Sequence, residues 1–568
     1  MKFNYLTRIR IISICIFIFA LLLIGRLYII QVVNNDFYIN KADRQYISTA
    51  KTIFNRGSIF FQNKDNSLVT AATLKSGFVI AINPEILLDP ENVYKTVNGI
   101  IPIDHDTFIA KAQKAKDPYE EIANHVDTLT GQQISDLKIP GLEAYKDRWR
   151  FYPGGNVASH IIGILGYKGD EYAGRYGLES QYETQLVRKD GAFTNFFAEI
   201  FSDIKAGTSD SLQKEADVVT TIEPTVQSYL QDIIASTTKK WSGDVTGGII
   251  MNPSTGEIYA MEAYPTFDLN HPEGEKNVSI FSNPLVENVY EMGSIIKPLT
   301  ISAGIDSGVI TATSTYYDAG FVMVNNKKIS NFDDKVRGTV TMQDVLSQSL
   351  NVGAAHVESL LGNERFTNYM YNFGVNVRTG IDLPNEAMNL VDNLKSPRDI
   401  EHATASFGQG IALTPISTIR ALAAVANGGF LVNPHIVKTL NYKIGISKNI
   451  PIVTGCHVIK RETSEELSRM LTYSVDKVLM GGTLRIPNYS VAAKTGTAQI
   501  AKPGGGGYFD NEVMHSFVGY FPSYNPKFII LLYMVNPKGA RFGSETLTVP
   551  FMNIVNFLIN YYEVPPDR

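Results

Sequence analysis

Strand patterns at both ends of the C-terminal part of the chain constrain its fold more strongly than any other feature. Residues 247–262, GGIIMNPSTGEIYAME, predict a hairpin made of an apolar strand, an Asn-Pro-Ser-Thr-Gly turn and a second strand. Strand patterns return at 488–500, 514–522 and 526–535, and PFMNIVNFLINYY predicts a C-terminal helix. Helical and loop patterns fill the interval up to about residue 480. The chain therefore predicts an α/β sandwich in which early and late strands share one sheet.

One of the late strands, VAAKTGTAQI at 491–500, combines an apolar start with a cation, two hydroxyls and a glycine. Thr495 and Thr497 have the same parity, so their hydroxyl groups are expected on one face of the sheet. Gly496 removes a side chain from the run, and a glycine inside a strand often marks the close approach of another backbone. The pattern predicts an edge strand that presents Lys494, the hydroxyls and bare backbone to a ligand. An isolated Lys-Thr-Gly more often marks a surface turn, so this interpretation requires partner residues elsewhere in the chain.

Composition excludes several classes of protein. The chain has 568 residues, 44% hydrophobic and 19% charged, which predicts a folded protein of two or three domains. Its formal net charge of −5 argues against non-specific nucleic-acid binding. Two cysteines, Cys15 and Cys456, exclude a disulfide framework and a cysteine-based zinc site, and no histidines have metal-ligand spacing. KPGGGG at 502–507 lacks the order of a phosphate-binding loop and predicts a hairpin connection, so we expect neither a metal nor a cofactor.

An apolar segment near the N-terminus predicts a membrane anchor. Residues 11–33 carry a single charge, Arg26, and as a helix they would span roughly 34 Å, enough for a hydrocarbon core about 30 Å thick. Lys2, Arg8 and Arg10 precede the segment, which by the positive-inside rule keeps the N-terminus in the cytoplasm. A cleaved signal peptide is the alternative, but the segment is long and offers no small-x-small cleavage site. We therefore predict a single-pass protein of the cytoplasmic (inner) membrane whose remaining residues are extracytoplasmic.

The region between the anchor and the C-terminal sandwich has a mixed composition. The apolar runs GFVIAIN (77–83) and HIIGILGY (160–167) predict strands, and a charged stretch at about 104–138 predicts helices. A polar segment, KAGTSDSLQKEAD at 205–217, predicts a linker. The following VVTTIEPTVQSYLQDIIAS predicts a strand that leads into an amphipathic helix.

A candidate nucleophile lies in YEMGSIIKPLT, residues 290–300. Ser294 and Lys297 are three residues apart and would occupy neighbouring positions on one helical face. Serine needs an adjacent base at neutral pH, and a lysine can serve if burial or a nearby cation disfavours its ammonium form. Gly293 and Pro298 place the pair near a helix N-terminus, which favours developing negative charge. Six other serines also have a lysine three residues on, so the spacing alone is a weak signal.

A third candidate element, SQSLNVGAAHVESLL at 347–361, contains Ser349 and Asn351 at an expected loop-to-helix junction. Serine or asparagine at such a junction is most often a helix cap. In a catalytic site, Ser349 can instead relay a proton between a lysine and a leaving amine, and Asn351 can hold a substrate amide. This element alone does not decide between the two interpretations.

Taken together, the three elements have a known order. Ser294-x-x-Lys297, Ser349-x-Asn351 and Lys494-Thr495-Gly496 follow one another as in penicillin-binding proteins and serine β-lactamases. The chain resembles a class B penicillin-binding protein over nearly its whole length. Further segments that carry the resemblance are NRGSIFF (55–61), RFYPGGNVASHIIGILGY (150–167), GRYGLESQYETQL (174–186), FGQGIALTPISTIRALAAVANGG (407–429) and HSFVGYFP (515–522).

The resemblance implies a particular α/β fold and domain order. The fold is the penicilloyl-serine transferase (β-lactamase-like) fold, a five-stranded antiparallel sheet flanked by helices. The implied parts are a cytoplasmic tail and transmembrane anchor at 1–35, an elongated α+β dimerisation or pedestal module at 36–215 and a transpeptidase domain at 216–568. Three positions depart from the family pattern: FFQNKDNSL follows the Arg-Gly segment, Met292 stands where proline is usual, and Ala493 stands where glycine is frequent.

The resemblance also implies an activity. The chain would be a serine-type D-Ala-D-Ala transpeptidase that cross-links peptidoglycan stem peptides, releases D-Ala and is acylated by β-lactams. Ser294 would be the nucleophile and Lys297 the general base. The other implied site residues are Ser349, Asn351 and Lys494 for catalysis and Thr495, Gly496 and Thr497 for substrate binding, with the backbone N–H groups of Ser294 and Thr497 as the oxyanion hole.

Partners and alternatives follow from the same resemblance. A membrane glycan polymerase and other divisome or elongasome proteins are implied as partners, and the choice between division and elongation stays open. A D,D-carboxypeptidase or a β-lactamase would share the motifs but pass the acyl group to water. A β-lactam-sensing receptor would need signalling segments, and a non-catalytic scaffold would not need the intact motifs.

Overall fold

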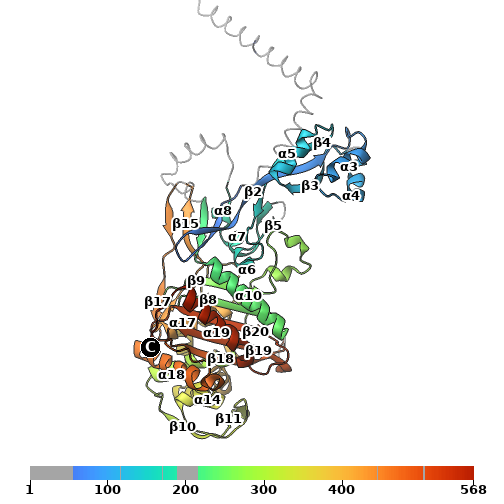
Figure 1. The fold of residues 1–568 in the computed structure, drawn as a ribbon. Coiled ribbons are helices and arrows are strands. Elements are labelled where there is room, and N and C mark those ends of the chain that lie inside the picture. The colour runs from blue at the N-terminus through green and yellow to red at the C-terminus, as the bar shows by residue number, and fades with distance from the viewer. Residues whose placement is uncertain are drawn as a thin grey trace, which may run out of the picture. The chain divides into compact units, whose positions relative to one another are not determined.

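The structure is a computed structural model that describes residues 55–114, 117–168, 171–188, 215–443, 445–502 and 506–568, together with residues 19 and 504. These residues form two compact units (Figure 1). The N-terminal unit contains Lys75–Trp149, and the main unit contains Arg56–Leu74, Arg150–Arg188 and the described residues from 215 onward. Within the described ranges, no helix is both long enough and apolar enough to cross a bilayer. The predicted membrane segment at 11–33 and most of the predicted linker at 205–217 lie outside these ranges.

The main unit is built on a five-stranded antiparallel sheet that joins the two ends of the C-terminal region. Its strands, in spatial order, are β18 (Ala492–Ala501), β19 (Tyr508–Phe521), β20 (Phe528–Val535), β8 (Val245–Met251) and β9 (Ile258–Tyr264). β20 pairs with β8, so that Ile529 lies opposite Met251 and Val535 lies opposite Val245. Early and late strands therefore share one sheet, as the sequence predicts, and β18 lies at its edge.

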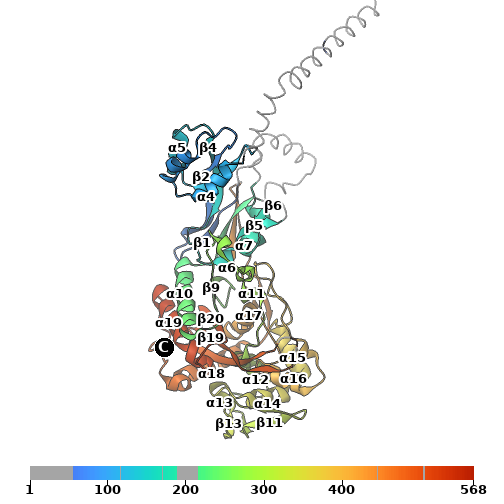
Figure 2. The same cartoon turned by 90° about the vertical axis from the view of Figure 1, so that its right-hand side faces the viewer.

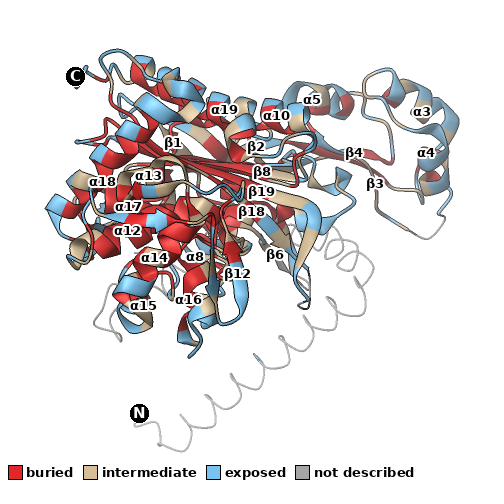
Figure 3. Cartoon of the chain, turned by 90° about the horizontal axis from the view of Figure 1, so that it is seen from below, coloured by how far each residue is buried: buried red, intermediate tan, exposed pale blue. Residues whose placement is uncertain are grey.

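Helices cover both faces of this sheet (Figure 3). The covering helices are α10 (Pro224–Trp241) and α19 (Gly543–Tyr561) on one face and α12 (Lys297–Asp306), α17 (Pro415–Ala426) and α18 (Arg461–Tyr473) on the other. Along β20, Ile530 and Leu532 join the core with α10 and α19, whereas Ile529 and Leu531 join the core of the opposite face. Because both faces are buried, the strand reads as the continuous apolar run FIILLYMV rather than as an alternating pattern.

A largely helical segment connects β9 to β18. Its further helices are α11 (Pro284–Glu287), α13 (Met342–Ser347), α14 (Asn351–Leu361), α15 (Asn363–Asn372) and α16 (Asp399–Ala405). Short strands also occur here, which the sequence pattern misses: β10 (Thr315–Asp318), β11 (Phe321–Val324), β12 (Lys327–Ser330), β13 (Gly338–Thr341), β14 (Phe430–Val432) and β17 (Thr454–His457). These strands pair into two-stranded sheets, and none has more than four residues. Strands this short do not show a clear alternation of apolar and polar residues in the sequence.

A second sheet of the main unit contains strands that are far apart in sequence. β1 (Ile59–Gln62) pairs in parallel with β7 (Ala216–Thr220) and antiparallel with the first residues of β2 (Leu68–Ile82). β7 pairs with β15 (Val437–Tyr442), which pairs in turn with β16 (Ser447–Asn449). The predicted strand-to-helix passage in VVTTIEPTVQSYLQDIIAS is confirmed by β7 and α10.

Three segments that carry the family resemblance meet in a buried ion network. The Nε atoms of Arg56 and Arg150 each donate to one carboxylate oxygen of Glu179, both at 2.6 Å. Nη2 of Arg56 also donates to Glu183 Oε2 at 2.6 Å. Glu179 is fully buried, and the two arginines are 3% and 7% exposed. Burial alone would lower the pKa of Arg56, but the carboxylates of Glu179 and Glu183 override that effect and raise it.

The segment HIIGILGY is predicted to be a strand throughout, but only its second half forms one. The prediction is therefore wrong for the first half. The segment forms α6 (Ser159–Ile162) and then β5 (Leu165–Lys168), which pairs with β6 (Glu171–Gly174). Gly163 separates the two elements at φ 76°, a conformation that glycine adopts without strain. Its missing Cβ leaves room for the Tyr176 carbonyl oxygen, which a side chain would overlap.

The N-terminal unit packs three helices against three strands. The elements are the second half of β2, α3 (Pro90–Asn98), α4 (His105–Ala112), β3 (Glu120–Val126), α5 (Thr128–Asp136) and β4 (Leu142–Phe151). The helical prediction for 104–138 is wrong at its centre, where β3 pairs antiparallel with β2 and Val126 lies opposite Phe78. Ile122 and Val126 are four residues apart, which fits a helix, but tertiary pairing with β2 overrides that local pattern.

Substitution of Glu179 tests the buried ion network. Glu179→Ala leaves two buried guanidinium groups without their shared carboxylate, so we expect the free energy of unfolding to fall by about 3–5 kcal/mol. Chemical denaturation measures this loss, and Glu273→Ala at an exposed position of the same unit is the control, with an expected change below about 0.5 kcal/mol. Equal unfolding midpoints for the two variants would contradict the role of the network.

Candidate active site

The predicted site residues come together at one pocket of the main unit. Ser294 lies in the short 3-10 helix Gly293–Ile296, and Lys297 is the first residue of α12. Ser349 lies in the turn between α13 and α14, and Asn351 begins α14. A pocket of about 450 Å³ is lined by Ser294, Ser349, Asn351, Lys494, Thr495, Gly496 and Thr497, among others. Lys297 is not part of this lining, because its side chain is fully buried beneath it.

The local backbone explains how Ser294 reaches the pocket. The preceding Gly293 has φ 61°, and a Cβ there would lie 2.8 Å from the carbonyl oxygen of Thr497. Glycine therefore allows this segment to pass directly over β18. In a 3-10 turn, side chains three residues apart eclipse each other, which favours contact between the side chains of Ser294 and Lys297. Among the described residues, none forms a hydrogen bond with the Ser294 hydroxyl, which is available to a ligand.

The Lys297 amine is surrounded by oxygen atoms that define its hydrogen bonds. Its Nζ lies 2.6 Å from the Ser349 carbonyl oxygen, 2.8 Å from Asn351 Oδ1 and 3.2 Å from Ser349 Oγ. The Asn351 amide is oriented by its Nδ2, which donates to the Ser330 carbonyl oxygen at 3.0 Å. The two carbonyl oxygens can only accept, so they occupy two N–H groups. A neutral amine has two N–H groups, so its lone pair faces the third and longest contact, the Ser349 hydroxyl group at 3.2 Å.

Electrostatics favour that neutral form. Burial, followed by repulsion from the nearby Lys494 ammonium, holds the pKa of Lys297 well below its ordinary value. Among the described residues, no carboxylate is a hydrogen-bond partner of Lys297, so no anion offsets these two effects. Either burial or a neighbouring cation would favour the neutral form of a lysine base, and both are present at Lys297.

Lys494 approaches the same hydroxyl group from the other side. Its Nζ donates to Ser349 Oγ at 2.9 Å and to the Thr495 carbonyl oxygen at 2.8 Å. The residue is 4% exposed, and burial lowers the pKa of its amine to about 7. Ser349 itself has φ 58°, a strained left-handed conformation for a residue with a side chain. In this conformation the Ser349 carbonyl oxygen contacts Lys297, and the Ser349 hydroxyl group contacts both lysines. No sequence signal indicates the left-handed conformation.

β18 occupies the edge position that its composition predicts, but Gly496 has a second role. A Cβ at Gly496 would overlap Ser516 Oγ and would lie 2.9 Å from the Met292 carbonyl oxygen. The sequence predicts that another backbone approaches Gly496 closely. At this position the approaching atoms belong to Ser516 and Met292 of the protein rather than to a ligand. Ser516 Oγ also donates to that Met292 carbonyl at 2.8 Å, which fixes β18 against the segment that carries Ser294.

Several pocket residues carry no motif and are missed by sequence analysis. Phe332 and Phe542 form an edge-to-face pair at the pocket, with ring centroids 5.6 Å apart. Arg337 Nε donates to Gln348 Oε1 at 2.8 Å and pairs with Asp333 at 3.0 Å. They lie in loops whose composition gives no signal. In the part of the chain that the structure describes, no group of His, Cys, Asp and Glu could hold a metal ion.

Comparison with known protein families agrees with this geometry. The family model "Penicillin binding protein transpeptidase domain" matches residues 203–555. The chain belongs to the penicillin-binding protein transpeptidase family. A second model, "Penicillin-binding Protein dimerisation domain", matches residues 53–195, and together the two domains identify a class B penicillin-binding protein.

Individual relatives are similar over most of their length. The chain is 28% identical over 524 residues to stage V sporulation protein D of Bacillus subtilis. This alignment covers 89% of the present chain and 78% of the Bacillus protein. The chain is 24% identical over 576 residues to the peptidoglycan D,D-transpeptidase FtsI of Buchnera aphidicola, covering 98% and 96%. A crystal structure of penicillin-binding protein 3 from Mycobacterium tuberculosis complexed with aztreonam shares the fold, with a TM-score of 0.69, 23% identity and coverage of 91% and 98%.

Substitution of Gly496 tests the close packing of the edge strand. Gly496→Ala places a methyl group against Ser516 Oγ, so we expect a loss of about 1–3 kcal/mol in the free energy of unfolding. In a Ser516→Ala background the overlapping oxygen is absent, and the same substitution should cost at least about 1 kcal/mol less. A double-mutant cycle by chemical denaturation measures the difference. An equal cost in both backgrounds would show that Ser516 does not limit the space at this position.

Proposed function

We propose that this penicillin-binding protein is a peptidoglycan D,D-transpeptidase in which Ser294 is the nucleophile and Lys297 the general base. The observation that carries the proposal is the full burial of Lys297, which follows Ser294 by one 3-10 turn and whose amine contacts only the carbonyl and hydroxyl oxygens of Ser349 and Asn351 among the described residues. The substrate is a stem peptide that ends in D-Ala-D-Ala, and β-lactams acylate the same serine. Both the family and the similarity to the peptidoglycan D,D-transpeptidase FtsI support this activity.

In the acylation step, Ser294 Oγ forms a bond to the penultimate carbonyl carbon and its proton moves to Lys297 Nζ. The carbonyl oxygen becomes an oxyanion, for which the backbone N–H groups of Ser294 and Thr497 are the proposed donors. The C–N bond to the terminal D-Ala then breaks, and the leaving amine takes a proton. The Ser349 hydroxyl lies between the two lysines, at 3.2 Å and 2.9 Å, which supports its role as the relay for that proton. An amine of a second stem peptide then attacks the ester and frees Ser294.

The edge of β18 supports binding of the donor peptide as an added strand. No strand of the described sheet pairs with the outer edge of β18, so its backbone groups are open to a peptide. The Gly543 N–H donates to Thr497 Oγ1 at 3.0 Å, which leaves the hydroxyl hydrogen of Thr497 free to donate. Together with Thr495 and the Lys494 amine, this donor suits the terminal carboxylate of the substrate. Asn351, held by Ser330 and Lys297, is placed to contact a peptide amide.

The cellular context is proposed from sequence. The anchor at 1–35, the pedestal module at 36–215 and the transpeptidase domain at 216–568 are the proposed parts, in a single-pass protein of the cytoplasmic membrane with its catalytic domain outside the cytoplasm. The uncharged run at 11–25, with Lys2, Arg8 and Arg10 before it, supports this orientation. A membrane glycan polymerase and divisome or elongasome proteins are the proposed partners.

Covalent labelling tests the nucleophile. We expect the full-length protein to form a stable adduct with a fluorescent penicillin and Ser294→Ala to form none, because no acyl acceptor remains. Ser347→Ala, which removes another hydroxyl from the same pocket, should keep near-normal labelling. Persistent labelling of Ser294→Ala would refute the assignment, and rapid turnover of the drug would indicate a β-lactamase.

The pH dependence of acylation tests the base. Lys297 acts only when neutral, so the rate should rise with pH through a pKa well below the ordinary value for lysine. Lys297→Ala should slow acylation by about 10²–10⁴. Lys494→Met removes the neighbouring cation that lowers the pKa of Lys297. The rising limb of the acylation rate against pH should therefore move to higher pH. Lys494→Arg keeps the charge and should move this limb less. Stopped-flow acylation rates measure both effects, and a limb that moves to lower pH in Lys494→Met contradicts the proposed coupling.

A further inference from the structure

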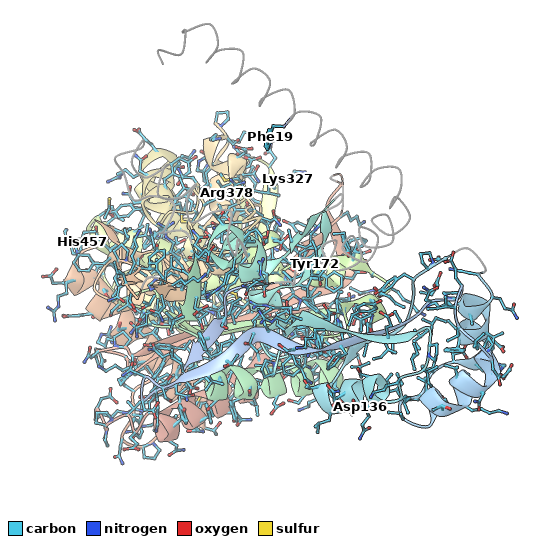
Figure 4. The ribbon with its side chains drawn as sticks, turned by 90° about the horizontal axis from the view of Figure 1, so that it is seen from above. Phe19, Asp136, Tyr172, Lys327, Arg378 and His457 are labelled. Atoms are coloured by element: carbon cyan, nitrogen blue, oxygen red, sulfur yellow. The ribbon has the colours of Figure 1, made fainter. Side chains whose placement is uncertain are left out.

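A second pocket, of about 650 Å³, lies on another face of helix α14 and shares no lining residue with the Ser294 pocket. One wall is a helical stripe of α14 with the spacing of a single face: Val352, Ala355, His356 and Ser359. The opposite wall is β11, whose four residues all line the pocket, and its hairpin partner β12 begins at Lys327, which is labelled in Figure 4. Tyr316 and Tyr317 of β10 and the first residue of α16, Asp399, also line the pocket, and α14, β11 and α16 are labelled near one another in Figure 2.

Much of the lining of this pocket is apolar or aromatic. Tyr317, Phe321 and Met323 are 67%, 45% and 56% exposed, which is high for such side chains in a folded protein. The Tyr316 ring stacks on the His356 imidazole at 5.2 Å between centroids. Exposed aromatic faces and a thioether around a cavity are typical of a small-molecule site.

A buried carboxylate in the lining lacks a partner. Glu358 is 2% exposed, and its Oε1 has no hydrogen-bond partner among the residues that the structure describes. Burial, followed by repulsion from Asp399, raises the pKa of Glu358 to about 7. Buried polar atoms in folded proteins are nearly always satisfied, so an unsatisfied carboxylate beside a cavity indicates that its partner is a ligand.

The pocket has no cation of its own. Its lining contains two carboxylates, Glu358 and Asp399, and neither lysine nor arginine. Among the basic side chains nearby, Lys328 lies 3.7 Å from Asp334 with its amine 5.0 Å from the centre of the Phe321 ring, and Arg337 lies 3.0 Å from Asp333. Charge complementarity therefore favours a cationic ligand.

We propose that this pocket binds an organic cation, a protonated amine carried on an aromatic or apolar body. The ammonium group pairs with Glu358 and Asp399, and the body lies among Tyr317, Phe321 and Met323. Carboxylates supply charge-assisted hydrogen bonds, and the exposed ring of Tyr317 attracts a cation further. This inference concerns a surface separate from the Ser294 site and does not depend on the proposed acyl transfer.

Calorimetry on the full-length protein with 2-phenylethylammonium tests the proposal. We expect one saturable site with a Kd of about 1 mM or tighter, and at least about tenfold weaker binding of the neutral isostere 2-phenylethanol. Glu358→Gln keeps the shape of the side chain and removes its charge, so it should weaken binding of 2-phenylethylammonium by at least about tenfold. Glu364→Gln, at an exposed position of the adjoining helix α15, should leave binding unchanged.

Two further measurements make the result decisive. Ser359→Trp fills the pocket from its exposed side and should abolish binding, while thermal unfolding shows whether each variant is folded. Protein whose Ser294 pocket is blocked by a penicillin should bind the amine with unchanged affinity. Equal affinity for amine and alcohol, unchanged affinity in folded Glu358→Gln, or loss of binding after penicillin treatment would each overturn the proposal.

Discussion

Two lysine side chains without carboxylate partners lie side by side in the interior of this protein. Lys297 is fully buried and Lys494 is 4% exposed, and both direct their amines at the Ser349 hydroxyl. Neither lysine can keep its ordinary pKa there, because burial disfavours the charged form of both amines and repulsion from Lys494 lowers the pKa of Lys297 further. The fold therefore holds two amines in surroundings that disfavour their charge, which is the condition under which a lysine can act as a base toward a serine.

The architecture exists to bring these groups together from distant parts of the chain. Antiparallel pairing of β20 with β8 joins the late strands to the early hairpin and leaves β18 at the free edge. Glycines at 293 and 496 then allow the serine segment and β18 to approach within contact distance. The strained turn at Ser349 contributes the last piece, since both its carbonyl oxygen and its hydroxyl group bind the lysine amines.

The sequence predicts much of this arrangement because several of its signals are local. Parity and apolar runs locate the hairpin at 247–262 and the late strands, and the edge position of β18 follows from its composition. Other features depend on long-range contacts and leave no local signal. Glu179 gives no indication that two distant arginines meet it, and the strand Glu120–Val126 has helix-like spacing until β2 pairs with it. The left-handed backbone conformation of Ser349 also leaves no local signal, because tertiary contacts rather than the neighbouring sequence impose it.

The protonation state of Lys297 is the central claim of this account, and it can be measured directly. Protein labelled with 13C at the lysine ε-carbons can be titrated by NMR, with the Lys297 resonance assigned by its loss in Lys297→Met. The account predicts a Cε shift characteristic of a neutral amine at pH 7.5 in the unacylated protein. A Lys297 that stays charged until the pH approaches about 10.4, the value of an unperturbed lysine, would contradict it.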